Sequence, residues 1–407
     1  MTRRVAITGI GIVTSHGIGK DVNWRKTLAG ESSIRPITLF ETPTYRTKRA
    51  GQVVDLPVAP WRRLRASRID RASHLLHHAV AEALAESGVT GADWSPSRSV
   101  VALGTTLGGM ASGERYHQSY VRKGPAHARP SLVLDHLAHA QPLHVMEEFS
   151  LGGTARVFSN ACASGANAVG HGFRLIRAGQ GDRALCGGYD PLCEFAFAGF
   201  HSLQALTTEL CRPFDRNRSG LVIGEGAGIL VLEAWDLARA RGARILGEIV
   251  GYGETNDAFH MTRPEPEGKS AAAALRQAVQ DARVAPEDVD YVNAHGTGTP
   301  FNDASETAAL LAALGPRARE IPVSSSKSMI GHLLGGAGAV EGILTVLAIR
   351  EGWLPPNVNY ETPDPECGLR IVQTATRAER LRVALSNSFG FGGANAVLVF
   401  RAVGADA

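Results

Sequence analysis

The same five features occur twice, in the same order, along this chain of 407 residues. Each part opens with a strand-like run ending in glycine, followed by an alanine-rich helical segment and a strand with a glycine–threonine loop. A loop of small residues then opens a Gly/Ala-rich helix, and a glycine-rich turn with a β-rich run closes the part. The paired segments are RVAITGIG and RILGEIVGYG, residues 74–87 and 270–283, VVALGTT and YVNAHGTGT, FSNACASGANAVGHG and SSSKSMIGHLLGGAGAVEG, and GEGAGILVLEA and GFGGANAVLVFRA. The repeat is too long for a solenoid and predicts an internally duplicated α/β fold with halves 1–243 and 244–407.

Composition indicates a globular protein that does not bind nucleic acid. Hydrophobic residues make up 44% and charged residues 20% of the chain, and the net charge of +3 is too small to indicate nucleic-acid binding. The longest apolar runs are shorter than the ~18 residues that a membrane span needs. The apolar run at the N-terminus is short and broken by glycines, so we expect a first strand there rather than a signal peptide. Five cysteines without a CxxC pair favour a reducing cytoplasm over a disulfide framework or a zinc site.

Cys162 lies in residues 158–172, FSNACASGANAVGHG, between a strand-like run and a segment with helical spacing. A thiol at the N-terminus of a helix feels the positive end of the helix dipole, which favours the nucleophilic thiolate. Two readings are open for the residue alone: a small buried cysteine packed at a helix start, or a nucleophile.

Two histidines in glycine-rich segments favour the nucleophile. His295 ends the apolar run 290–294 and begins HGTGT, and parallel α/β sheets bind ligands at the carboxyl ends of their strands. His332 ends KSMIGH, ahead of a helix expected over 337–350. A metal site built from these residues is disfavoured because no two ligands have short, regular spacing, whereas a cysteine with histidine support is a common nucleophile. Residues 390–395, GFGGAN, form either a hairpin turn or a loop with N–H groups free to stabilise an oxyanion.

Three further segments carry expectations about structure. A helix is expected to begin after Pro60, with arginines crowding its first turns as a binding face or an ordinary solvated face. Residues 113–150 lack clear periodicity and are interpreted as a long excursion that covers an active site or forms an interface. Residues 221–233, LVIGEGAGILVLE, suggest a hairpin or adjacent strands.

Four motifs in order, NACASGANAVGHG, NAHGTGTPFND, SSSKSMIGHLLGGAGAVEG and SNSFGFGGANA, resemble those of the β-ketoacyl-acyl-carrier-protein synthases. These are condensing enzymes of the thiolase superfamily, and their Cys-His-His, synthase II-like type is the most similar. The resemblance covers nearly the whole chain. It implies a thiolase-like fold in which two duplicated halves form a five-layered αβαβα architecture, usually as a dimer.

The resemblance also implies roles for individual residues. Cys162 would accept the acyl chain, while His295 and His332 would bind the malonyl thioester and promote its decarboxylation. Lys327 would be a fourth catalytic residue, tuning the electrostatics of His332. Further implied roles are an oxyanion hole from the N–H groups of Cys162 and Phe391, substrate contacts from Thr297, Thr299, Phe391 and Leu107, and support from Glu341 and Asn395.

The function implied is decarboxylative Claisen condensation of malonyl-acyl carrier protein with the acyl chain, in either fatty-acid or type II polyketide or polyene synthesis. No cofactor is implied, because the phosphopantetheine arrives on the carrier. The alternative is a non-catalytic partner subunit like the chain-length factors, which Cys162 disfavours. A thiolase is also disfavoured, because residues 386–395 lack its second cysteine. The expected partners are an acyl carrier protein, docked on Arg62, Arg63, Arg65 and Arg68, and a second subunit, either a copy of this chain or a chain-length-factor homologue.

Overall fold

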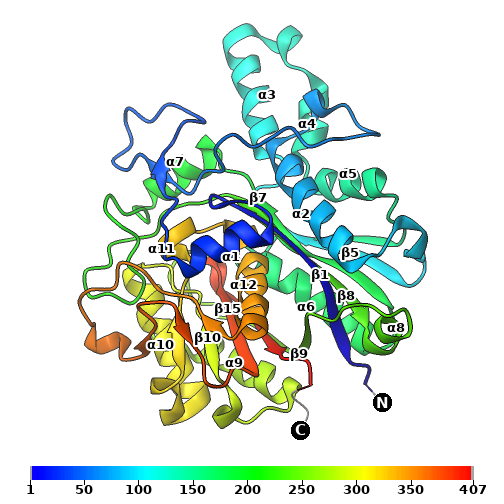
Figure 1. The fold of residues 1–407 in the computed structure, drawn as a ribbon. Helices are drawn as coiled ribbons and strands as arrows, with labels where there is room; N and C mark the ends of the chain where they lie inside the picture. The colour runs from blue at the N-terminus through cyan, green and yellow to red at the C-terminus, as the bar shows by residue number, and fades with distance from the viewer. Residues whose placement is uncertain (1, 405–407) are drawn as a thin grey trace.

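The computed structural model describes residues 2–404, and its main feature is a mixed β-sheet whose two halves repeat one strand order (Figure 1). In the N-terminal half the order from the edge inward is β6 (Thr154–Phe158), β5 (Ser99–Gly104), β7 (Arg183–Asp190), β8 (Gly226–Ala234) and β1 (Val5–Thr14). In the C-terminal half the corresponding order is β11 (Pro322–Ser324), β10 (Tyr291–Asn293), β15 (Val383–Phe389), β16 (Ala394–Arg401) and β9 (Gly247–Asn256). β1 and β9 pair antiparallel and join the halves. Five strands of each half therefore have counterparts in the other, as the repeated motifs predict, and β13 (Arg370–Ile371) adds an edge strand beyond β11 that has no counterpart among the described residues.

Helices cover both outer faces and fill the space between the halves, giving the predicted αβαβα layers. α2 (Arg71–Ser87) packs on β1 and β8, and α9 (Lys269–Ala282) packs on β9 and β16. α6 (Ser164–Arg177) and α12 (Ala337–Glu351) contact each other and strands of both halves, and α12 is buried almost throughout. A central layer buried on all sides needs apolar and small side chains all round, which explains why both helices are rich in glycine and alanine.

The remaining elements surround this frame. The other helices are α1 (Lys20–Leu28), α3 (Met110–Lys123), α4 (Pro130–His136), α5 (Ala140–Phe149), α7 (Glu194–Ser202), α8 (Trp235–Ala240), α10 (Pro300–Leu314) and α11 (Lys327–Ile330). The other strands are β2 (Gly17–Ile18), β3 (Arg35–Pro36), β4 (Arg49–Ala50), β12 (Trp353–Leu354), β13 (Arg370–Ile371) and β14 (Thr376–Arg377). No helix in the part of the chain that the structure describes is both long and apolar enough to cross a membrane.

Two local predictions were wrong, and a third was incomplete. The helix expected after Pro60 begins only at Arg71, because the carboxylate of Asp70 caps it by accepting from the N–H of Ala72. Residues 113–150 do form an excursion, but they are mostly helical, as α3, α4 and α5, and α3 and α4 extend away from the sheet (Figure 1). Residues 221–233 contain one strand, β8, rather than a hairpin, since both edges of β8 are already occupied by β1 and β7.

Candidate active site

The fold brings Cys162, His295 and His332 together, with one ligand atom of each within 4.8 Å of the others. Cys162 lies in the turn between β6 and α6, His295 follows β10, and His332 follows α11. β10 pairs parallel with β11 and β15, so His295 lies at the carboxyl end of a parallel strand, as expected. The side chains are 5%, 2% and 1% exposed, so the three groups meet in a nearly dry site.

Cys162 is held at the start of α6 by a strained backbone. Ala161, the residue before it, has a φ of 48°, a left-handed conformation that costs energy in a residue with a Cβ. The backbone N–H of Phe391 faces the Cys162 sulfur and lowers the pKa of its thiol. Burial nevertheless raises the pKa of the Cys162 thiol to about 11, against the lowering by the Phe391 N–H and the Lys327 charge. In the free protein the cost of desolvating the anion therefore opposes the thiolate that the helix terminus favours.

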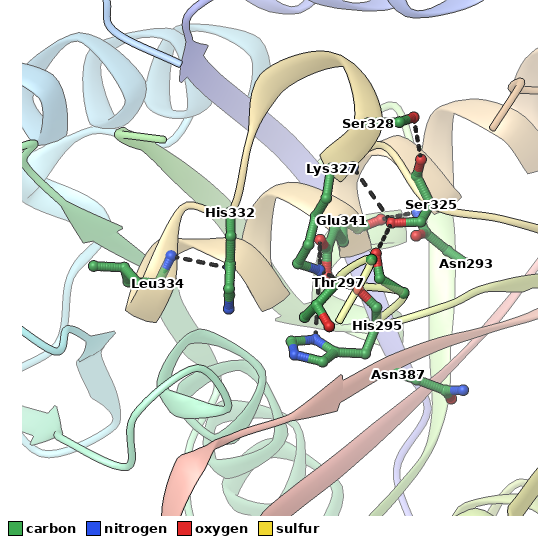
Figure 2. Close-up of polar contacts among 12 residues, drawn as sticks. Asn293, His295, Thr297, Ser325, Lys327, Ser328, His332, Leu334, Glu341 and Asn387 are labelled. Atoms are coloured by element: carbon green, nitrogen blue, oxygen red, sulfur yellow. Dashed lines mark hydrogen bonds and ion pairs between the residues drawn. The ribbon is translucent and has the colours of Figure 1, made fainter. Parts of the chain in front are cut away.

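Both imidazoles present an Nε2–H group. The N–H of Leu334 donates to Nδ1 of His332 at 3.3 Å, so the proton of the neutral ring is on Nε2 (Figure 2). Nε2 of His332 is buried and has no hydrogen-bond partner among the described residues. Nδ1 of His295 lies 3.4 Å from the Lys327 ammonium, which can only donate, so His295 also carries its proton on Nε2. Burial, together with the charge of Lys327, holds the pKa of each ring well below its ordinary value.

The spacing argument against a metal site does not hold in three dimensions, because the fold gathers residues that are distant in the sequence. The tautomers of the two imidazoles supply a better argument against a metal site. A metal binds the lone pair of a deprotonated nitrogen, whereas both rings carry their proton on Nε2, and the Lys327 ammonium lies beside His295. The three residues thus place one thiol beside two hydrogen-bond donors.

Lys327 is fully buried; its hydrogen bonds go to His295, and its charge also acts on His332 and its surroundings, the role the sequence predicted for it. Its Nζ donates to the carbonyl oxygen of His295 at 2.6 Å and forms an ion pair with Glu341. Burial raises the pKa of Glu341 to about 7, although the Lys327 charge and hydrogen bond lower it. Asn395, the other residue assigned a supporting role, donates to Asp257 at 2.7 Å and so anchors the 390–393 turn to the segment after β9.

Two buried carboxylates that the sequence analysis missed hold the loop after β10. Glu306, on α10, accepts from the N–H groups of His295 and Gly296, each at 2.8 Å. Asp303, one turn earlier, accepts from the N–H of Gly298 at 3.2 Å. Their three-residue spacing on a helix directly after HGTGT was the available signal, since both then face the loop.

A cavity of about 310 Å³ leads from Cys162 to the surface. Thr297 and Thr299 line it, and their hydroxyls lie 2.8 Å apart. Phe391 lines it beside Phe200, with which its ring stacks at 5.6 Å between centroids.

Leu107 does not line this cavity. It packs in a buried apolar cluster with Cys193, Ala196 and Leu334, next to Met110 and Phe200. The carboxylate of Asp190 holds the loop that carries Leu107 by accepting from the N–H groups of Thr106 and Leu107.

The arginines expected to bind a partner do not line the cavity either. Arg62 and Arg63 donate their backbone N–H groups to Glu148, at the end of α5, and lie in a segment without regular structure. Arg65 precedes a short 3₁₀ turn, residues 66–68, and the side chain of Arg68 lies outside the described part of the structure.

Family models match both halves of the chain: residues 2–238 match the β-ketoacyl synthase N-terminal domain and residues 246–361 the C-terminal domain. The chain belongs to the β-ketoacyl synthase family. It is 40% identical over 407 residues to 3-oxoacyl-[acyl-carrier-protein] synthase 2 of Synechocystis sp., with 98% of each chain covered.

Solved structures of similar synthases have the same fold. The ishigamide ketosynthase/chain length factor superposes with a TM-score of 0.95 at 37% identity, covering 99% of this chain and 100% of the other. A chain from the complex of a type II PKS acyl-carrier protein with its ketosynthase bound to the hexaketide superposes with a TM-score of 0.90 at 30% identity, with the same coverage. The fold predicted from the sequence, a thiolase-like fold, is confirmed.

Proposed function

We propose that this β-ketoacyl synthase condenses an acyl chain carried on Cys162 with a malonyl unit delivered on an acyl carrier protein. The observation that carries the proposal is the convergence of the Cys162 thiol with the Nε2–H groups of His295 and His332. A buried thiol with two fixed donors suits a reaction in which negative charge develops on a thioester oxygen. The presence of the nucleophile also favours a catalytic subunit over a non-catalytic chain-length factor.

In the first half-reaction, the Cys162 sulfur attacks the carbonyl carbon of the acyl thioester. The oxyanion forms between the N–H groups of Cys162 and Phe391, and the latter already points at the sulfur. The intermediate collapses by breaking the bond to the carrier sulfur, and the thiol proton leaves with the carrier thiol. Because the resting thiol has a raised pKa, the proton must depart as the carbon–sulfur bond forms.

In the second half-reaction, the malonyl thioester oxygen accepts hydrogen bonds from His295 and His332. The bond to the carboxylate breaks, CO₂ leaves, and its electron pair forms an enolate whose oxygen the two Nε2–H groups stabilise. The enolate carbon attacks the acyl-Cys162 carbonyl, the carbon–sulfur bond breaks, and the Cys162 thiolate takes up one proton. Neutral imidazoles are the right form for this role, because their lowered pKa values prevent them from protonating and quenching the enolate.

The proposed substrate path is the cavity, with the hydroxyls of Thr297 and Thr299 contacting the pantetheine arm and Phe391 gating the approach to Cys162. Leu107 would form one wall of the acyl pocket, within its apolar cluster.

We propose that no cofactor takes part, since two donors and one thiol account for both half-reactions. Five buried cysteines with no disulfide among the described residues support a reducing cytoplasm.

The carrier protein is proposed to dock on Arg62, Arg63, Arg65 and Arg68, because carrier proteins are acidic and a local basic patch steers such a partner. Glu148 accepts from the backbone N–H groups of Arg62 and Arg63 and so fixes the backbone at the start of this segment. Charge-reversal variants at Arg62 and Arg65 should raise the KM for the acyl carrier protein and leave that for a carrier-free thioester unchanged. An equal effect on both substrates would contradict this docking site.

A second chain of the same fold is proposed to bind along β6 and α3–α5. β6 is an edge strand that pairs with β5 alone among the described residues, so one row of its backbone groups is available to another strand. Exposed apolar side chains on the excursion support the same face: Tyr120 (48%), Val121 (65%), Leu134 (67%) and Leu143 (49%). Native mass spectrometry of the chain alone distinguishes a homodimer from a subunit that needs a chain-length-factor homologue. A chain that stays monomeric both alone and when mixed with a chain-length-factor homologue would contradict the proposal.

We also propose that the duplicated halves meet near residue 244, between β8 with its helix α8 and β9. The matched strand orders of the two halves support this division.

Product analysis tests the proposed function. Incubation with malonyl-carrier protein and acyl primers of graded length should give β-ketoacyl products and one CO₂ per condensation. Primer-dependent formation of these products would support the synthase assignment, and the chain lengths used would separate fatty-acid from polyketide or polyene synthesis. Malonyl decarboxylation without carbon–carbon bond formation would contradict it.

A further inference from the structure

Arg263 lies at the outer end of the cavity that leads to Cys162. Among the residues that line this cavity it is the sole arginine or lysine. The opposite wall runs outward along the chain from His295 (2% exposed) through Thr297 (5%) to Phe301 (58%). A substrate arm that reaches Cys162 therefore leaves the protein between Phe301 and the segment that carries Arg263.

The guanidinium of Arg263 is held but not neutralised. Its central carbon lies 5.1 Å from the centre of the Phe301 ring, and no acidic side chain pairs with it in the described part of the chain. The three carboxylates nearest in sequence have other partners, and Glu267 forms an ion pair with Lys269 at 2.7 Å. Asp257 accepts from Asn395 and from the N–H of Glu265, and Glu265 accepts from the N–H of Lys269. The charge of Arg263 is thus available to a ligand.

The segment around Arg263 is fixed to the turn beside the nucleophile. The N–H of Gly392 donates to the carbonyl oxygen of Met261 at 2.8 Å, and the N–H of Asp257 donates to Gly393 at 2.9 Å. His260 accepts from the N–H groups of Thr262 and Arg263 through its Nδ1. A cation on such a fixed segment loses less conformational entropy when it binds an anion than one on a free loop.

We propose that Arg263 binds the phosphate of the phosphopantetheine arm, with the Phe301 ring orienting the guanidinium. The inference rests on the proposed use of a carrier-bound thioester. The order of groups along such an arm matches the order along the cavity: the thioester at Cys162, the uncharged pantetheine amides at the threonine hydroxyls, and the anionic phosphate at the rim. A guanidinium offers a planar pair of donors to two phosphate oxygens, which a lysine ammonium cannot reproduce. Arg263 is accordingly a specificity-determining residue that makes the enzyme prefer phosphorylated arms.

The test compares two carrier-free substrates that differ only in the phosphate, acyl-phosphopantetheine and acyl-pantetheine. Acylation of Cys162 is followed by intact mass for the wild type, Arg263→Ala, Arg263→Lys and a control, Arg239→Ala, whose side chain is exposed on α8 and away from the cavity. A charged hydrogen bond at a partly exposed site is worth roughly a tenfold change in binding. We expect Arg263→Ala to raise the KM for acyl-phosphopantetheine about tenfold with kcat unchanged, because a single charged contact is lost. The KM for acyl-pantetheine should not change, Arg263→Lys should be intermediate, and Arg239→Ala should match the wild type.

Two results would overturn the inference. One is a wild type with the same KM for both thioesters, and the other is an Arg263→Ala variant whose KM rises by the same factor for both. In either case Cys162 is still acylated, so the proposed function survives. If neither thioester acylates Cys162 in the wild type, the proposed function fails and the inference fails with it.

Discussion

The Lys327 ammonium is bound to His295 at two atoms: it donates to the carbonyl oxygen at 2.6 Å and lies 3.4 Å from Nδ1. An ammonium has no lone pair, so Nδ1 must accept and the ring proton is directed from Nε2 toward the substrate site. Glu341 pairs with the same ammonium from the central helix α12. Lys327 therefore fixes the tautomer of His295, and its charge adds to burial in holding the pKa of the ring well below its ordinary value.

Replacement of Lys327 by methionine should uncouple stability from catalysis. Breaking a buried ion pair costs roughly 3–5 kcal/mol, because the remaining charge is left without a partner. We expect Lys327→Met to lower the free energy of unfolding in urea, and Lys327→Met/Glu341→Gln to recover much of that loss. Neither variant should decarboxylate malonyl-carrier protein at a rate near that of the wild type, since both lack the donor to His295. A double variant with normal decarboxylation would contradict the positioning role.

Replacement of His332 should separate the two half-reactions. Removing one preorganised donor from a developing oxyanion costs about 10²–10³ in rate. His332→Ala should therefore release CO₂ from malonyl-carrier protein about 10²–10³ times more slowly. Cys162 should still accept an acyl group. Measuring CO₂ release and acyl-enzyme mass on the same sample distinguishes this from misfolding, which would abolish both. Equal losses in the two assays would argue against the assignment.

The reactivity of Cys162 should rise steeply across the alkaline range. Burial raises the pKa of its thiol to about 11, so the thiolate fraction of the free protein should increase about tenfold for each pH unit between 7 and 10. Iodoacetamide alkylation, located by peptide mapping, measures this. The buried Cys186 is an internal control that should react still less, because its pKa is raised further. A rate that levels off below pH 8 would mean that the thiolate is stabilised more than the geometry indicates.

Acid should destabilise the protein through its active-site imidazoles. The pKa values of His295 and His332 lie well below that of an unfolded histidine, so the unfolded chain takes up protons first as the pH falls. Their stabilising contribution is complete above the unfolded pKa, near 6.5, and is lost progressively below it. His332→Gln should flatten the slope of unfolding free energy against pH between about 6.5 and 5. A variant with the wild-type slope would show that His332 does not contribute.

The loop that carries Leu107 should depend on Asp190. This carboxylate is fully buried, and it accepts from the N–H groups of Thr106, Leu107 and Gly335. An amide in its place has one acceptor oxygen, so Asp190→Asn should leave a buried donor unpaired at a cost of about 1–3 kcal/mol. We expect a change in primer-length preference, read as KM across acyl thioesters, together with lower stability. A Thr307→Val variant, which removes a hydroxyl on α10 that bonds within its own helix, serves as a control for general destabilisation.

The sequence was sufficient to predict the architecture and the residues that converge on one site, because both depend on short motifs that recur in order along this chain. The duplicated strand order and the meeting of Cys162, His295 and His332 follow from it. The raised pKa of Cys162 could not be predicted from the sequence, since it depends on how completely the folded chain excludes water. Glu306 was missed because its main partners are backbone N–H groups, so its one signal was the three-residue spacing from Asp303 directly after HGTGT. The helices of the 113–150 excursion were missed because their exposed faces break the apolar periodicity.

The most direct measurement is the intact mass of the wild type and of Cys162→Ala after incubation with an acyl-carrier protein and no malonyl substrate. The account predicts an acyl adduct on the wild type, located on the peptide containing Cys162, and none on the variant. An adduct of the same mass on Cys162→Ala, or an adduct on another residue of the wild type, would contradict the claim that Cys162 is the nucleophile.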